Sequence, residues 1–94
     1  MKYILICEDR KDSLEVRLGN RDRHLSYLGE LGDRVSLAGP MLSDDGESMV
    51  GSVLIIEAES ASEIQAIADG DPYALAGLFE TVTIRPFRQV IPGA

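Results

Sequence analysis

The sequence predicts an α+β fold, a ferredoxin-like βαββαβ arrangement built on an antiparallel sheet. Two observations support this fold class. Short β-favouring apolar runs and segments of helical periodicity follow one another in the order strand, helix, strand, strand, helix, strand. The chain has 94 residues, enough for one domain, so we expect a single domain over residues 1–94.

The first third of the chain predicts a strand followed by a long helix. Residues 3–7 are an apolar, β-favouring run. Asp12 and Ser13 offer helix-capping oxygens, and leucines then recur at helical intervals. These features predict a helix over 13–31 with a weak point at Gly19-Asn20, where it could bend, and Gly32-Asp33 ends it.

The rest of the chain predicts three strands, one helix and one short helical turn. Ser60 and Glu63 form a capping box, and Asp71 before Pro72 starts a short helical turn. Pro86 predicts that the last strand lies at an edge or contains a bulge. The expected elements are a strand over 35–41, an exposed loop over 43–48, a strand over 51–58, a helix over 60–69 and a strand over 79–90.

The first strand is apolar on both faces. Because side chains alternate along a strand, Tyr3, Leu5 and Cys7 point one way, and Ile4 and Ile6 point the other. The third strand has the same character. Two helices on one side of the sheet cover only one of these faces, so the pattern predicts that a second copy covers the other and that the protein is a homodimer.

Composition excludes several classes of function. The net charge is −7, from 16 acidic and nine basic residues, which disfavours nucleic-acid and anionic membrane partners. One cysteine allows no internal disulfide, and the first apolar run is too short for a signal or a membrane span, so we expect a cytoplasmic protein. One histidine and one cysteine predict no metal site, and the lack of a glycine-rich phosphate loop predicts no nucleotide cofactor.

The long helix predicts an apolar face with basic residues beside it. The expected core-facing residues are Leu14, Leu18, Leu25 and Leu28. Neighbouring positions along one flank of that face carry Arg17, Arg21 and His24. Such a flank suits a small anionic molecule, because guanidinium donors match carboxylate geometry. The other interpretation is that both arginines make exposed ion pairs of little consequence.

His24 and Asp71 are the candidate catalytic residues. A carboxylate that reaches the imidazole would fix its tautomer and leave the other ring nitrogen free as a general acid or base. The competing interpretations are that His24 is a surface residue and that Asp71 caps the helical turn, although capping is compatible with catalysis because an ionised carboxylate accepts several hydrogen bonds. Ser36 and Tyr73 could line the same pocket, or could simply be strand and packing residues. Cys7, within an apolar strand, is expected to be a buried small hydrophobe.

Several segments together resemble the YCII-related, YciI-like family. They cover nearly the whole chain in order: Ser13-Leu14-Glu15-Val16-Arg17-Leu18, Arg21, His24-Leu25, Ala38-Gly39-Pro40-Met41, Gly51-Ser52, Asp71-Pro72-Tyr73, Ala76-Gly77 and Arg85-Pro86-Phe87. The resemblance implies a dimeric α/β barrel with a site formed by a histidine and an aspartate, which correspond to His24 and Asp71. It also implies two kinds of relative, lyases or dehydrochlorinases of chlorinated aromatics and accessory domains.

Two functional hypotheses follow from the residues and the resemblance. In the first, His24 moves a proton on a small anionic substrate in an elimination or isomerisation, Asp71 orients it, and Arg17 and Arg21 hold the anionic end. In the second, the same pocket binds a metabolite without catalysis, or the dimer serves as an accessory domain. Fold alone does not choose between them.

Overall fold

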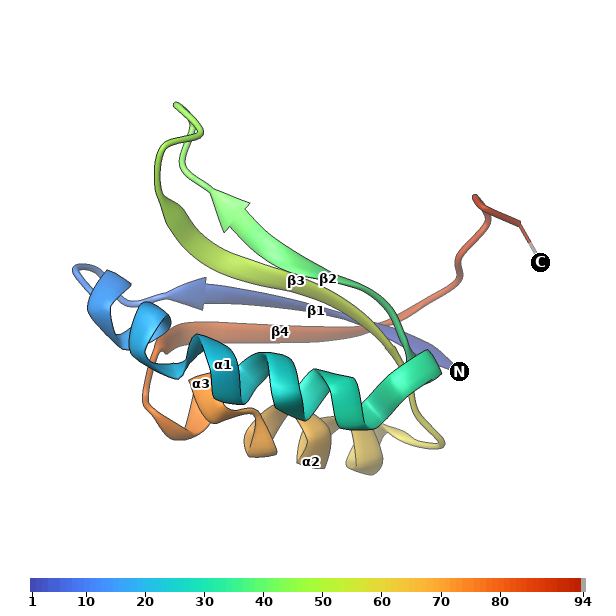
Figure 1. The fold of residues 1–94 in the computed structure, drawn as a ribbon. Helices are drawn as coiled ribbons and strands as arrows, with labels where there is room; N and C mark the ends of the chain where they lie inside the picture. Colours follow the sequence, from blue (N-terminus) through green and yellow to red (C-terminus); the bar gives the residue numbers. More distant parts are fainter. Residues whose placement is uncertain (94) are drawn as a thin grey trace.

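A computed structural model describes residues 1–93 and confirms the α+β, ferredoxin-like fold class. Its four strands form one antiparallel sheet in the order β2-β3-β1-β4, with the helices on one side (Figure 1). No helix within the described residues is long and apolar enough to cross a membrane. The elements are β1 (Lys2–Asp9), α1 (Leu14–Leu31), a 3-10 turn η1 (Gly32–Arg34), β2 (Val35–Leu42), β3 (Met49–Glu57), α2 (Ala61–Gly70), α3 (Pro72–Leu75) and β4 (Phe79–Phe87).

The element boundaries lie close to those predicted and differ by a few residues at several ends. α1 runs without interruption from Leu14 to Leu31, and Gly32 ends it at a φ of 58°, where glycine avoids the penalty that a Cβ would bring. Ser13 precedes α1, but its hydroxyl donates to the carbonyl of Lys11 (3.2 Å) and does not cap the helix. β1 is longer at both ends than predicted, and β4 ends at Phe87.

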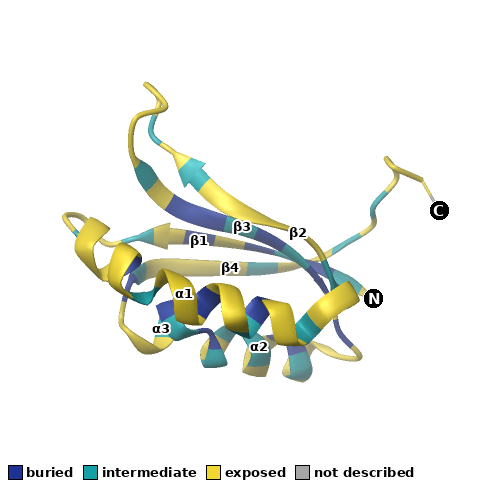
Figure 2. Ribbon diagram, in the orientation of Figure 1, coloured by how far each residue is buried: buried dark blue, intermediate teal, exposed yellow. Residues whose placement is uncertain are grey.

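The core lies between the helices and the sheet. Tyr3 pairs with Ile56 and Leu5 with Leu54 across β1 and β3, so these four side chains share one face. All four are at least 93% buried, and Leu28 of α1 packs against them. Figure 2 shows the buried residues concentrated in β1, β3 and the inward side of α1, whereas β2 and β4 are largely exposed.

The opposite side of the sheet is apolar and bare. We call it the open face, and it consists of Ile4, Ile6, Leu37, Val53 and Ile55. No element within residues 1–93 packs over it, and Ile6 and Leu37 are 37% and 52% exposed. The two outer strands each contain a proline, Pro40 in β2 and Pro86 in β4, and the position of β4 confirms the edge strand that Pro86 predicted.

The orientation of α1 differs from the prediction. Three of the four leucines expected in the core are about half exposed, namely Leu14, Leu18 and Leu25. The buried side of α1 instead carries Arg17, His24 and Leu28. Burying charged or polar groups is costly unless they are paired, so the rotation of the helix implies partners for Arg17 and His24 beneath it.

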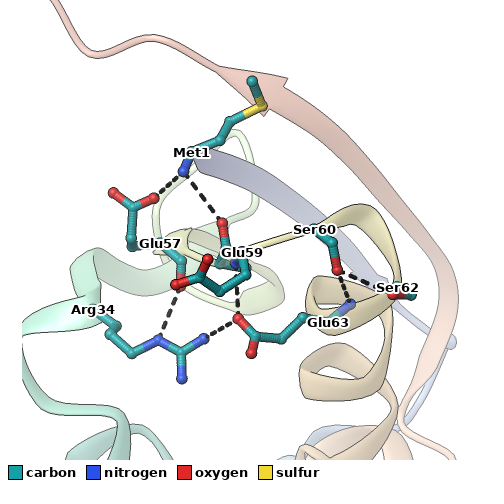
Figure 3. A network of polar contacts seen from close by, with 8 residues as sticks. Met1, Arg34, Glu57, Glu59, Ser60, Ser62 and Glu63 are labelled. Carbon is teal, nitrogen blue, oxygen red and sulfur yellow. Dashed lines mark hydrogen bonds and ion pairs between the residues drawn. The ribbon is translucent and has the colours of Figure 1, made fainter.

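The junction between β3 and α2 is held by a polar network (Figure 3). The Ser60 hydroxyl accepts the Glu63 N–H (3.1 Å), which confirms the predicted N-cap. The Glu63 carboxylate accepts the Glu59 N–H (2.9 Å) and an Arg34 N–H (2.6 Å), and Arg34 also donates to the Glu57 carbonyl (3.1 Å). These bonds fix the start of α2, and α2 in turn carries the chain to Asp71 at its other end.

A glycine in β3 provides a test of the sheet packing. A Cβ on Gly51 would lie 2.3 Å from the carbonyl oxygen of Cys7, a backbone atom of the neighbouring strand. We expect Gly51→Ala to lower the free energy of unfolding by about 1–3 kcal/mol, because the strands must move apart. Gly39→Ala in β2 is the matched control, since a Cβ there meets no atom within 4 Å. Urea unfolding measures both, and equal stability of the two variants would contradict the packing described.

Candidate active site

His24 and Asp71 meet beneath α1, although 47 positions separate them in the chain. The Nδ1 atom of His24 lies 2.8 Å and 3.0 Å from the two carboxylate oxygens of Asp71. Both side chains are buried, with at most 9% of either exposed. An ionised carboxylate only accepts hydrogen bonds, so the Nδ1 atom is the donor and carries the proton.

The break between α2 and α3 positions Asp71. Pro72 occupies the first position of α3, where its missing N–H costs nothing, and Asp71 stands just before it with extended backbone. The Oδ1 atom of Asp71 also accepts the N–H of Tyr73 (2.9 Å). The capping role and the contact with His24, which the sequence indicated to be compatible, belong to the same carboxylate.

The second ring nitrogen of His24 is free. Every fully buried side-chain nitrogen or oxygen in residues 1–93 has a hydrogen-bond partner, whereas the Nε2 atom of His24 has none, so this atom reaches solvent. It lies on the side of the ring away from Asp71. A neutral imidazole in this state presents a lone pair that accepts a proton, and its protonated form donates one.

Tyr73 is packed between His24 and Arg17. Its ring stacks on the imidazole, with centroids 4.0 Å apart and planes 15° apart. The guanidinium carbon of Arg17 lies 4.7 Å from the centroid of the same ring. Arg17 and His24 are two helical turns apart, about 10.5 Å along the axis, so Tyr73 fills the space between them. Burial raises the pKa of the Tyr73 phenol, although the charge of Arg17 opposes the rise, and the phenol therefore stays protonated near neutral pH.

Arg17 is buried in an ion pair. Its Nε and Nη2 atoms donate to the two oxygens of Asp9 (2.7 Å and 2.8 Å), and Nη2 also donates to the Ser52 hydroxyl (3.0 Å). Burial acts to lower the pKa of Arg17, but the hydrogen bond and charge of Asp9 raise it overall, so the guanidinium stays charged. The interpretation of Arg17 as an exposed arginine was therefore wrong.

Two other predicted site residues lie outside this buried cluster. Arg21 is exposed on α1, one turn beyond Arg17. Ser36 is exposed on the outer strand β2, between Val35 and Leu37, where the pairing with β3 shifts register. Asp9 and Ser52 were not among the predicted site residues. Strand alternation from Leu54 places Ser52 on the helix-facing side and is the signal that could have found it.

The exposed leucines of α1 form an apolar flank next to the histidine. Leu14, Leu18 and Leu25 lie on the same side of the helix as Arg21, at about 100° of rotation per residue. Tyr27 lies on the other side, where its hydroxyl donates to the Ile67 carbonyl of α2 (2.8 Å). The leucine flank therefore faces away from α2.

A cavity of about 600 Å³ opens at the start of this flank. It lies between the β1–α1 loop and the ends of β2 and β3, and Asp9 and Leu14 belong to both the cavity and the site. Met41, Met49 and Val50 add apolar walls. Its volume is in the range of small-molecule sites, but its lining also carries the carboxylates of Glu8, Asp9 and Asp12, and neither His24 nor Asp71 lines it. Among residues 1–93, no three His, Cys, Asp or Glu side chains are grouped to hold a metal ion.

Comparison with known proteins identifies similar sequences and a similar solved structure. The YCII-related domain matches residues 1–88. Protein YciI of Escherichia coli O6:H1 is 42% identical over 96% of this chain and 99% of its own. An uncharacterized protein of Haemophilus influenzae is 33% identical over the same shares. Among solved structures, the 5-chloro-2-hydroxyhydroquinone dehydrochlorinase of Burkholderia phenoliruptrix, in complex with 2,5-dihydroxybenzoquinone, has a TM-score of 0.88 and 34% identity, with both chains fully covered.

The tautomer of His24 can be measured directly, because it is the only histidine. We expect long-range ¹H–¹⁵N spectra of the neutral ring to show a protonated Nδ1 and an unprotonated Nε2. Asp71→Asn retains a good helix cap but offers an amide in place of the carboxylate, so the population should move toward protonated Nε2. Asp69→Asn, an exposed carboxylate nearby, is the control. A wild-type ring that favours protonated Nε2 would contradict the assigned pair.

Because the Cys7 thiol is buried, we expect the protein to lose stability in alkaline solution. Burial first, and then the charges of Asp71 and Asp9, raise the pKa of the Cys7 thiol from 9.0 to about 12, against a lowering by Arg17. The folded protein favours the neutral thiol. The contribution of this thiol to the free energy of unfolding is therefore complete below pH 9 and is lost as the pH rises toward 12. The free energy of unfolding in urea should fall less between pH 8 and pH 10.5 for Cys7→Ala than for the wild type. An equal difference would contradict this shift.

Proposed function

This chain belongs to the YCII-related family, and on that premise we propose that it is an enzyme using His24 and Asp71 for general acid–base chemistry on a small anionic organic molecule. The reaction class is elimination or isomerisation. The observation that carries the proposal is the free Nε2 atom of a buried imidazole whose Nδ1 atom is held by a carboxylate. The arrangement matches a base oriented by a second group.

The proposed step is a proton transfer coupled to loss of a leaving group. The Nε2 atom takes a proton from a C–H or O–H group of the substrate. The electron pair left behind forms a new π bond, and the leaving group departs with the electron pair of the bond that joined it to the substrate. Asp71 stabilises the resulting imidazolium through the Nδ1–H bond. In an isomerisation, the imidazolium returns the proton to another atom of the substrate.

Binding of an anionic ring compound fits the surroundings of the imidazole. The leucine flank supplies apolar contact, and Arg21 offers an exposed guanidinium beside it. Arg17 adds a fixed positive charge behind Tyr73. The similar dehydrochlorinase, whose complex contains a dihydroxybenzoquinone, supports a small oxygenated ring as the substrate class.

We propose further that the protein acts in the cytoplasm as a homodimer. Support for the pairing comes from the open face, where exposed Ile6 and Leu37 lie beside Ile4, Val53 and Ile55. Burial of such a face releases water from apolar surface, at roughly 25 cal/mol per Å². A chain of this size has a small core of its own, so the gain matters for its stability.

Replacing the histidine tests the proposed activity. With 5-chloro-2-hydroxyhydroquinone as the probe, we expect chloride release by the wild type and a loss of about 10²–10⁴-fold in kcat/KM for His24→Gln, which removes the proton acceptor. Arg23→Gln, an exposed change on the same helix, is the matched control and should leave the rate unchanged.

The probe also separates the two hypotheses. Calorimetric binding of the probe with no chloride release or isomerised product would favour the non-catalytic metabolite-binding domain. Turnover retained in His24→Gln would remove the histidine from the chemistry.

A further inference from the structure

A second cavity lies at the other end of the sheet from the candidate active site. Its volume is about 760 Å³, and it is formed by the start of β1, the end of β4 and the segment that follows β4. In Figure 1 that segment leaves the sheet on the side opposite the helices. A strand rises about 3.3 Å per residue, so the Cα atom of Lys2 in this cavity is about 23 Å from that of Asp9. The cavity is therefore separate from the buried pairs of Arg17 and His24.

Two basic side chains line this cavity, and none of its described lining residues is acidic. The two are Lys2 and Arg88. The Nζ atom of Lys2 donates to the Oε1 atom of Gln89 (2.9 Å), which is a neutral acceptor, and Gln89 in turn donates to the Pro92 carbonyl (3.3 Å). Within residues 1–93 neither Lys2 nor Arg88 takes part in an ion pair. Both positive charges are therefore available to an anion.

Glu57 is the acidic residue beside Lys2 on this side of the sheet. The two residues pair across β1 and β3, but Glu57 does not line the cavity. Its carboxylate accepts a hydrogen bond from the Met1 amine, which also donates to the Ala58 carbonyl (3.2 Å), as Figure 3 shows. The amine therefore offsets the charge of Glu57. Arg85 adds a further cation on the same side of β4, so positive charge is in excess here although the whole chain carries −7.

Apolar side chains form the remaining walls of the cavity. Phe87 pairs with Lys2 across β4 and β1, so both side chains lie on the same side of the sheet. Pro86 and Pro92 also line the cavity. Its volume lies within the range of small-molecule sites, which combine mostly apolar walls with a few charged or polar groups. Guanidinium donors match the geometry of a carboxylate, and Arg88 offers them here.

We propose that this cavity is a second binding site, and that it takes a small carboxylate with an apolar body. The charged end lies at Lys2 and Arg88, and the body packs against Phe87. The two cations favour an anion over a neutral molecule of the same shape. The apolar walls favour an anion that carries a hydrocarbon part, because a fully hydrated inorganic anion gains nothing from them. The site is additional to the proposed function and does not depend on it.

Octanoate is the probe for this site. Calorimetry should give a Kd of about 0.1–1 mM, which is ordinary for a ligand of this size. The backbone N–H signals of Lys2 and of residues 87–89 should shift in ¹H–¹⁵N spectra. Octan-1-ol has the same body without the charge, and acetate has the charge without the body. Both should bind at least about tenfold more weakly, and equal binding of either would overturn the proposed ligand class.

Variants of the two cations test the charged end. Lys2→Gln with Arg88→Gln should weaken octanoate binding at least about tenfold, because both charge-assisted contacts are lost. Lys11→Gln with Arg23→Gln removes the same charge from exposed positions outside the cavity and should keep wild-type affinity. Arg88→Gln alone changes an exposed side chain and should weaken binding about fivefold even if the double variant does not fold. Unchanged affinity in Arg88→Gln would overturn the site.

Competition separates this site from the candidate active site. Octanoate should bind His24→Gln with wild-type affinity, and it should not compete with 5-chloro-2-hydroxyhydroquinone. Competitive inhibition of chloride release, or signal shifts centred on Ile6 and Leu37 of the open face, would place the probe elsewhere and overturn the proposal. Calorimetry reads octanoate binding without turnover. A chain that releases no chloride but binds octanoate would therefore contradict the proposed enzyme and support this second site.

Discussion

Polar side chains buried between α1 and the sheet must each find a partner, and this constraint organises the structure. Two acidic residues meet it. Asp9, at the end of β1, holds Arg17, and Asp71, at the start of α3, holds His24. Tyr73 fills the gap between the two pairs with an aromatic ring. Helix, sheet and the α2–α3 junction are thereby joined by charged hydrogen bonds as well as by apolar contact.

The same constraint explains which sequence predictions succeeded. The order of elements followed from local signals, such as Gly32 at a helix end and Ser60 with Glu63 at a helix start, and these signals act over a few residues. The contact between His24 and Asp71 depends on tertiary structure across 47 positions. Local patterns could identify both residues as candidates, and the family resemblance implied that they form one site. Their spacing in the sequence alone could not predict the contact.

The orientation of α1 shows where hydrophobic patterning fails. A helical wheel places leucines in the core because apolar burial is the usual driving force. In this helix Arg17 and His24 take the inward positions, since Asp9 and Asp71 compensate their burial. Leu18 is left on the leucine flank, where it is 53% exposed. The wheel could not anticipate this arrangement, because the compensating carboxylates lie outside the helix. Asp9 was missed for the same reason.

The prolines of the outer strands determine how this sheet can associate. Pro40 and Pro86 have no N–H to offer an incoming strand, and the pairing of β2 with β3 shifts register near both ends of β2. Growth by edge-to-edge strand addition, the route to fibrils, is hindered at both sides. Contact through a face closes after two subunits when it is symmetric, so the sequence disfavours open-ended polymers and leaves finite assemblies accessible.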